Sequence, residues 1–234
     1  MSSPAPAFTD VRILEVRQET PEHVHIALET PAELQRAYTI PGQYVRVQVE
    51  GQKPGFFAIA CGPAQERLEL LIKTGSPVAT IIAAKKAGET LSISAPEGKG
   101  YALDRAKGQS VFAVGVGSGI APLRALMHTV LKSRSEYGPL HLYYGARKST
   151  HFPYARELDD WAAQGVRVTR VCSQPDDGTW SGEVGRIQNI LRARKPPVDA
   201  NSAVFVCGMK AMVEDVTAVV GELGLSRERV FQNF

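Results

Sequence analysis

Three glycines at alternate positions follow a run of apolar residues and precede a proline. They are Gly115, Gly117 and Gly119, with Ser118 between the last two, and the proline is Pro122. Glycine permits positive φ and lets the backbone approach a ligand closely, and a proline in the first turn of a helix loses no hydrogen bond. The free N–H groups at a helix N-terminus favour a phosphate. The turn therefore predicts a binding site for a dinucleotide pyrophosphate.

The same residues would also suit a plain glycine-rich turn between a strand and a helix. Their spacing differs from the common G-x-G-x-x-G fingerprint, because the third glycine comes one residue early. After the next predicted strand no acidic residue is placed to clamp a ribose, and Arg147 and Lys148 stand there instead. Two cations could accept a 2′-phosphate, which favours NADPH over NADH; the alternative is two solvated surface charges.

Two further features lie at or near predicted strands. Cys207 ends a strand and precedes Gly208. The carboxyl edge of an open α/β sheet lines the ligand crevice, which would place Cys207 there; the alternative is a buried cysteine that packs as a small hydrophobe. His23 and His25 alternate on one predicted strand. This is weak evidence for a metal site and favours a role on the surface or on the face of a barrel.

The first hundred residues contain short segments of alternating or dense apolar residues, separated by turn residues. Several short strands at this spacing predict a small antiparallel barrel, interrupted by one helix. The predicted strands are Val11–Glu19, His23–Glu29, Gln43–Glu50, Phe56–Cys61, Arg67–Lys73 and Thr90–Ser94, and the helix runs from Pro77 to Lys86.

From about Gly108 the pattern changes, and predicted strands alternate with predicted helices. Such alternation predicts a parallel sheet with helices on both faces. We expect two domains, residues 1–106 and residues 107–234. The predicted strands of the second domain are Val111–Val114, Leu140–Tyr144, Val166–Cys172, Ala203–Val206 and a short one that ends at Phe234; the helices are Pro122–Ser133, Pro153–Ala163, Glu183–Arg194 and Lys210–Leu223.

Composition narrows the class of protein. The 27 basic and 24 acidic residues give a net charge of +3, which is too small to indicate a nucleic-acid partner. No 18 consecutive residues are apolar, which excludes a membrane span, and the first residues do not read as a secretory signal. The three cysteines are widely spaced and cannot alone form a disulfide framework, a zinc site or a four-cysteine cluster. These features favour a cytoplasmic protein.

The glycine turn together with Cys207-Gly208 resembles the ferredoxin–NADP reductase superfamily. Pro41-Gly42-Gln43-Tyr44 and Gly88-Glu89-Thr90 fit the same family, and the resemblance covers nearly the whole chain. Within the superfamily the chain is most similar to the branch named after a plant fruit protein. The stretches that carry this similarity are Lys53 to Ala60, Tyr143 to Arg147, Ser173 to Gly178 and the C-terminal Asn233-Phe234.

The resemblance implies an N-terminal antiparallel Greek-key β-barrel that binds FAD and a C-terminal α/β domain that binds NADPH or NADH. It implies a hydride transfer from nicotinamide to flavin, and a separate electron acceptor. Cys207 would be the catalytic-site residue beside the nicotinamide. The residues implied in cofactor binding are Phe57, Ala58, Ile59, Gly75, Val78, Ala79, Thr80 and Phe234 for the flavin, with Gly115, Gly117, Ser118, Gly119, Pro122, Arg147, Lys148 and Gly208 for the nicotinamide dinucleotide.

The chain departs from the family in its flavin motif. Gly55 stands where the family has an arginine that pairs with the FAD pyrophosphate, Phe57 replaces a tyrosine, and Ala58 replaces a serine. An arginine–phosphate pair is a strong charge-assisted contact, so its loss predicts weaker FAD binding. Lys53 could supply part of the charge. A non-catalytic dinucleotide-binding module, or an electron-transfer subunit with weak or no FAD binding, is therefore the alternative hypothesis.

Overall fold

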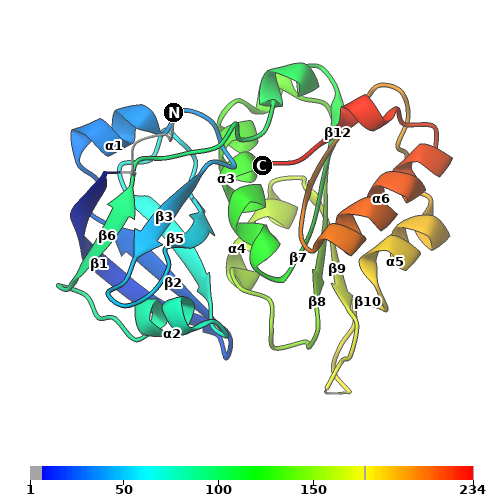
Figure 1. Ribbon diagram of the computed structural model, residues 1–234. Coiled ribbons are helices and arrows are strands. Elements are labelled where there is room, and N and C mark those ends of the chain that lie inside the picture. Colours follow the sequence, from blue (N-terminus) through cyan, green and yellow to red (C-terminus); the bar gives the residue numbers. More distant parts are fainter. Residues whose placement is uncertain (1–6, 177, 234) are drawn as a thin grey trace.

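The protein, described here by a computed structural model for residues 7–176 and 178–233, consists of two domains that lie side by side (Figure 1). The first is a six-stranded sheet in the order β4-β3-β6-β1-β2-β5, in which all neighbouring strands are antiparallel. Its elements are β1 (Phe8–Thr20), β2 (His23–Leu28), α1 (Ala32–Ala37), β3 (Tyr44–Gln48), β4 (Gly55–Ala58), β5 (Leu68–Lys73), α2 (Pro77–Ala83) and β6 (Thr90–Ser94).

The two edge strands of this sheet meet and close it. Directly after β4, Ile59 pairs with Leu70 of β5, and the Ala60 N–H donates to the Glu69 carbonyl at 2.7 Å. Closure removes the exposed sheet edges, which confirms the predicted barrel. Helix α1 was not predicted, because Leu34 is its one buried residue and the segment has no apolar stripe.

The second domain is a six-stranded sheet in the order β10-β9-β8-β7-β11-β12, in which all neighbouring strands are parallel. Helices α3 and α4 cover the face toward the barrel, and α5 and α6 cover the other face (Figure 1). This confirms the predicted α/β class. The elements are β7 (Ser110–Val116), α3 (Ile120–Lys132), β8 (Leu140–Ala146), α4 (Ala155–Ala163), β9 (Arg167–Cys172), β10 (Glu183–Val184), α5 (Ile187–Arg194), β11 (Ser202–Cys207), α6 (Lys210–Glu222) and β12 (Val230–Phe231).

One predicted helix of this domain is wrong at its start. The helix expected from Glu183 begins at Ile187, and Glu183 and Val184 instead pair with the end of β9. Gly185, which separates the two elements, has φ of +135°, a conformation that no helix contains. The final strand, expected to reach the C-terminus, ends at Phe231.

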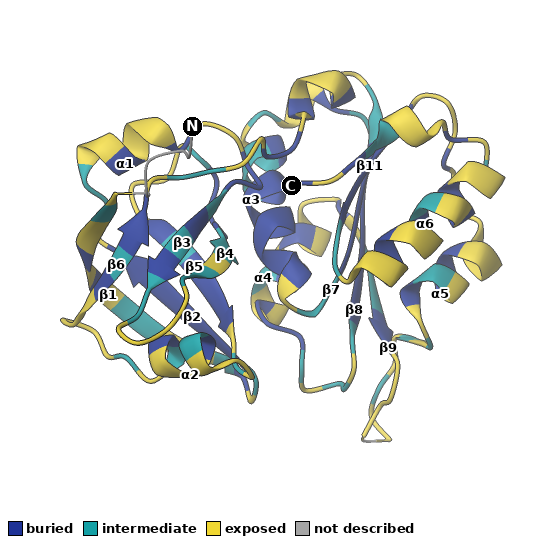
Figure 2. Cartoon of the chain, viewed as in Figure 1, coloured by how far each residue is buried: buried dark blue, intermediate teal, exposed yellow. Residues whose placement is uncertain are grey.

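Buried side chains fill the barrel and both faces of the parallel sheet (Figure 2). The core between α3, α4 and the sheet also takes in Tyr101, Leu103 and Ala106, which precede β7. We therefore propose that the domain boundary lies in the connection from Ser94 to Ser110; the boundary at 106/107 stays a prediction. Within the described residues, no helix is long and apolar enough to cross a membrane.

A buried polar cluster joins the domains next to this core. The Arg124 guanidinium of α3 donates to Glu157 of α4 at 2.6 Å, and to the Ala60 carbonyl and Glu69 of the barrel at 2.8 and 2.5 Å. It also lies over the Tyr154 ring, 4.5 Å from the ring centre. These contacts fix the barrel against α3 and so set the geometry of the space between the domains.

Candidate active site between the domains

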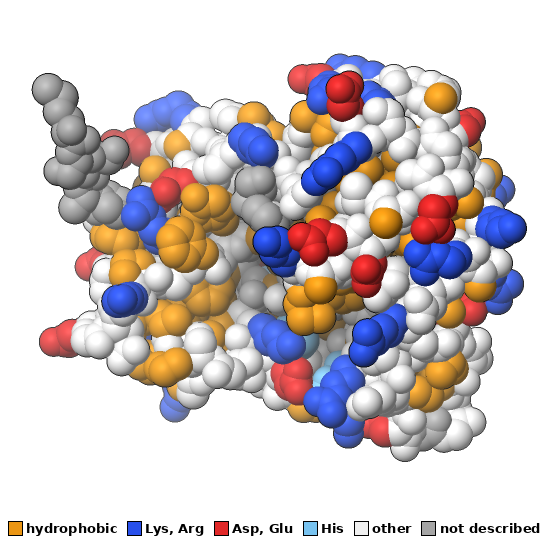
Figure 3. All heavy atoms as spheres, turned by 45° about the vertical axis from the view of Figure 1, so that its right-hand side comes forward, with side chains coloured by type: hydrophobic (Ala, Val, Ile, Leu, Met, Phe, Trp, Pro, Cys, Tyr) orange, Lys and Arg blue, Asp and Glu red, His pale blue; other side chains and the backbone are white. Residues whose placement is uncertain are grey.

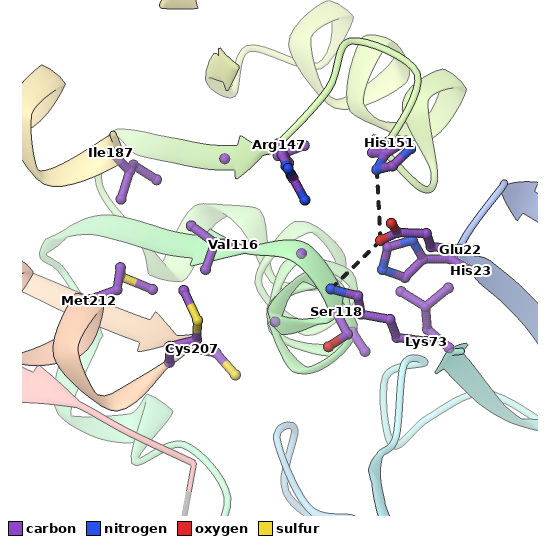
Figure 4. A pocket seen from close by; sticks show the side chains of 18 of the residues that line it. Glu22, His23, Lys73, Val116, Ser118, Arg147, His151, Ile187, Cys207 and Met212 are labelled. Atoms are coloured by element: carbon purple, nitrogen blue, oxygen red, sulfur yellow. Dashed lines mark ion pairs between the residues drawn. The ribbon is translucent and has the colours of Figure 1, made fainter. Parts of the chain in front are cut away.

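A cavity of about 970 Å³ lies between the barrel and the carboxyl ends of β7, β8, β9 and β11. Lysine and arginine side chains gather around the hollow between the two domains in the space-filling view (Figure 3). The close-up shows an apolar end at Val116, Ile187, Met212 and Cys207, and a polar end near His23 (Figure 4). The crevice therefore occupies the sheet edge where open α/β domains bind ligands.

The glycine turn forms part of the cavity floor, and its three glycines serve different purposes. Gly117 has φ of +54° and open space beside it, and its carbonyl accepts a hydrogen bond from the Tyr144 hydroxyl at 2.8 Å. A Cβ on Gly115 would lie 2.5 Å from the Leu123 side chain, and one on Gly119 would overlap the Cys207 carbonyl oxygen. Close packing of the strand ends thus requires two of the glycines, and backbone conformation requires the third.

Most of the predicted turn residues line the cavity. Gly117, Ser118 and Gly119 do so, whereas Gly115 lies beneath them. Helix α3 begins at Ile120, two residues earlier than predicted, so Pro122 is its third residue and also lines the cavity. A proline there remains within the first turn, where its missing N–H costs nothing.

Gly119 and Gly117 give a matched pair of variants, because one is closely packed and the other has open space beside it. Gly119→Ala is expected to lower the free energy of unfolding by about 1–3 kcal/mol, because its methyl group must push the end of β11 away. Gly117→Ala places its methyl group in open space and pays only for the left-handed backbone, about 1 kcal/mol. Thermal unfolding of both variants should give that order; equal losses would contradict the packing argument.

Cys207 and Gly208 line the apolar end of the cavity, at the sheet edge where Cys207 was expected. Their contact with a cofactor stays a prediction. A Cβ on Gly208 would overlap the Met212 side chain, so this residue also permits close packing. Burial raises the pKa of the Cys207 thiol to about 12. The cysteine is thus a neutral thiol at neutral pH, suited to packing beside a ring rather than to nucleophilic attack.

The barrel contributes an apolar wall. Phe57, Ala58, Val78 and Ala79 line the cavity, together with Ser76. Ser76 caps helix α2 by accepting the Ala79 N–H at 3.3 Å. The remaining flavin-site residues of the prediction lie elsewhere: Ile59 is in the barrel core, and Gly75 and Thr80 are exposed outside the cavity lining.

The position of the missing arginine is occupied by an aromatic ring. A Cβ on Gly55 would lie 2.7 Å from the Phe57 ring and 3.0 Å from Val78. Lys53, the substitute expected from the sequence, is exposed and does not line the cavity. The barrel cation that does line it is Lys73 at the end of β5, whose Nζ lies 3.7 Å from Glu22. No sequence pattern marks Lys73 as a cavity residue, because only the pairing of β5 with β2 brings it here.

The two cationic side chains after β8 lie in different surroundings. Arg147 lines the cavity, and its Nε donates to Gln174 Oε1 at 2.9 Å. Lys148 is not among the lining residues, and its Nζ lies 3.5 Å from Asp176. Phe234, predicted to cover the flavin, lies outside the described residues; its neighbour Asn233 donates to the Gly42 carbonyl at 3.0 Å.

His23 and His25, expected on the surface or on a barrel face, are both buried. One face of strand β2 packs into the barrel core, and the other face packs against the second domain. There His25 Nδ1 lies 3.1 Å from the Tyr154 hydroxyl. In the described part of the chain, no three His, Cys, Asp or Glu side chains gather so that they could hold a metal ion.

The comparisons with known proteins match both halves of this arrangement. Residues 113–218 match the family described as the oxidoreductase NAD-binding domain. The chain is 28% identical over 232 residues to sulfhydrogenase 1 subunit gamma of Pyrococcus furiosus, covering 96% of this chain and 78% of that one. It is 25% identical over 235 residues to fruit protein pKIWI502 of Actinidia deliciosa, covering 94% and 74%.

A solved structure of a ferredoxin–NADP⁺ reductase from Neisseria gonorrhoeae, with bound FAD and NADP, superposes with a TM-score of 0.80. The match covers 98% of this chain and all of that one, at 19% identity. The chain therefore has the two-domain fold of the ferredoxin–NADP reductases. This confirms the resemblance read from the glycine turn and Cys207-Gly208, and it assigns the two domains to the two halves of the reductase fold.

Proposed function

We propose that this chain is an FAD-dependent NAD(P)H oxidoreductase that passes electrons to a separate acceptor. The observation that carries the proposal is the cavity itself. One wall is the apolar barrel surface of Phe57, Ala58 and Val78, and the facing wall is the glycine turn with Cys207. A crevice between a ring-binding wall and a pyrophosphate-binding turn suits two cofactors that must meet.

The residues present fit FAD, although they differ from the family pattern. The apolar wall suits a flat aromatic ring, and Lys73 brings a positive charge into the cavity for a phosphate. When bound, FAD supplies a ring that accepts a hydride from nicotinamide and gives up its electrons one or two at a time. Because Lys73 is a point charge without the fork of an arginine, we expect weaker flavin binding than in relatives with that arginine.

The chain's own residues orient the cofactors and exclude water. Backbone N–H groups of the glycine turn and the N-terminus of α3 would hold the pyrophosphate of the nicotinamide dinucleotide. The neutral thiol of Cys207 and the Met212 side chain would pack at its nicotinamide end. None of these groups needs to transfer a proton, so catalysis rests on positioning. The electron acceptor and the expected cytoplasmic location stay predictions.

An absorbance spectrum of the purified chain tests this function. We expect flavin bands, or their appearance when FAD is added, and bleaching when NADPH or NADH is added without oxygen. The bands should return with an artificial electron acceptor. A colourless protein that gains no flavin absorbance with FAD would overturn the proposal. Thermal stabilisation by NADPH with none by FAD would favour the non-catalytic binding module instead.

A further inference from the structure

His23, the first residue of β2, is a buried histidine with an unused nitrogen. The residue lines the cavity, only 2% of it is exposed, and Nε2 has no hydrogen-bond partner among the described residues. Figure 4 shows its ring at the polar end of the cavity, the end where Ser118 of the glycine turn also lies. A buried polar atom without a partner costs free energy, which a ligand oxygen at this place would recover.

The opposite ring nitrogen fixes which nitrogen carries the hydrogen. His23 Nδ1 lies 2.8 Å from the hydroxyl of Thr20, a residue that is 5% exposed. The Thr20 hydroxyl oxygen accepts a hydrogen bond from the Glu22 N–H at 3.3 Å. Among the described residues, the acceptor within reach of the hydroxyl hydrogen of Thr20 is His23 Nδ1. Thr20 therefore donates to Nδ1, and the neutral ring carries its hydrogen on Nε2. His23 thus carries, at the polar end of the cavity, an N–H donor that has no partner among the described residues.

The surroundings of this donor suit a ligand rich in oxygen. Burial, assisted by Lys73, lowers the pKa of His23 to about 4, so the ring is neutral at neutral pH. Lys73 and His151 each lie 3.7 Å from Glu22, and all three line the same end of the cavity. Strand β5, which pairs with β2 at His23, contacts the glycine turn. A dinucleotide that rests on the turn would therefore pass close to β2.

We propose that His23 donates a hydrogen bond from Nε2 to a phosphate or ribose oxygen of the nicotinamide dinucleotide that rests on the glycine turn. The barrel would then supply one side of the nucleotide site, and the α/β domain the other. The inference rests on the proposed function, since it needs a dinucleotide in the cavity, but it concerns binding and not electron transfer. FAD carries the same kinds of oxygen, so the experiment must separate the two cofactors.

The test uses the full chain, as purified, and three variants. His23→Phe removes the donor, His23→Gln keeps an N–H at a similar reach, and His141→Phe removes another buried imidazole. His141 is 4% exposed, stacks on Phe112 and does not line the cavity, so it is a matched control. Fluorescence titration gives the dissociation constants of NADPH and NADH, absorbance gives the FAD content, and thermal unfolding shows that each variant folds.

We expect His23→Phe to raise the NADPH and NADH dissociation constants about tenfold, as loss of a hydrogen bond to a charged oxygen would. His23→Gln should restore most of the affinity, and His141→Phe and the FAD content should match the native chain. Unchanged nucleotide binding in folded His23→Phe would overturn the proposal alone. Loss of FAD with native nucleotide binding would assign the contact to the flavin and overturn it too. A native chain that binds neither NADPH nor NADH would overturn it together with the proposed function.

Discussion

Replacing Arg124 with methionine is expected to lower the free energy of unfolding by about 3 kcal/mol, because the change leaves two partly buried carboxylates without their cation. Arg124 is 8% exposed. Its side chain contacts both domains, and the partner carboxylates of Glu69 and Glu157 are 17% and 24% exposed. Water can therefore replace the guanidinium only in part.

The lowered pKa of Glu157 shows that the cluster stabilises this carboxyl in its charged form. Burial alone would raise the pKa of this carboxyl, but hydrogen bonds from His128 and Arg124 outweigh burial and hold the pKa below its usual value. His128 Nε2 lies 2.5 Å from Glu157 and would remain in the variant. Glu69, in contrast, would lose its ion-pair partner. We thus expect Glu69 to account for most of the cost.

Thermal unfolding and urea unfolding measure this effect. For a chain of this length, 3 kcal/mol corresponds to a fall in the melting temperature of about 6–12 °C. Arg192→Met is the matched control. Like Arg124, Arg192 makes two contacts with carboxylate oxygens, both of them on Glu222, but its side chain is half exposed. Its replacement should therefore lower the free energy of unfolding by less than about 1 kcal/mol. If both variants lose the same stability, the interdomain cluster contributes no more than a surface ion pair.

The glycine turn and Cys207 could be predicted from the sequence because their signals are local. A buried strand leads directly into three glycines and a proline that lie within eight residues of one another. An open α/β sheet then brings the carboxyl ends of its parallel strands to one edge. Helix α1 and strand β10 were missed for the opposite reason. Each is short, and β10 exists only because Glu183 and Val184 pair with β9.

The residues that the sequence could not predict depend on how the domains meet. His23, Lys73 and Arg124 lie far apart along the chain, and each gains its place from antiparallel pairing in the barrel or from packing of α3 against it. Gly55 illustrates the same limit. The sequence shows that an arginine is missing, but not that the Phe57 ring fills the space beside the glycine. Restoring the arginine alone would therefore displace Phe57.

Arg147 is expected to distinguish NADPH from NADH. Its side chain reaches the cavity at the end of β8 (Figure 4). Its Nε donates a hydrogen bond to Gln174. The backbone is fixed as well, because the Gln174 N–H donates to the Arg147 carbonyl at 2.8 Å. A guanidinium held in this way can meet a phosphate with little loss of side-chain freedom. The Lys148 side chain pairs with Asp176 and should contribute little to the binding of the 2′-phosphate.

Arg147→Ala is thus expected to raise the dissociation constant of NADPH about 30-fold, within the range for a hydrogen bond to a charged group, and that of NADH less than threefold. Lys148→Ala should change neither by more than about threefold, since its charge is already paired at the surface. Competition by 2′,5′-ADP and by 5′-AMP isolates the phosphate, because the two ligands differ only there. If Arg147→Ala weakens both ligands equally, Arg147 contacts a part that they share and does not select the 2′-phosphate.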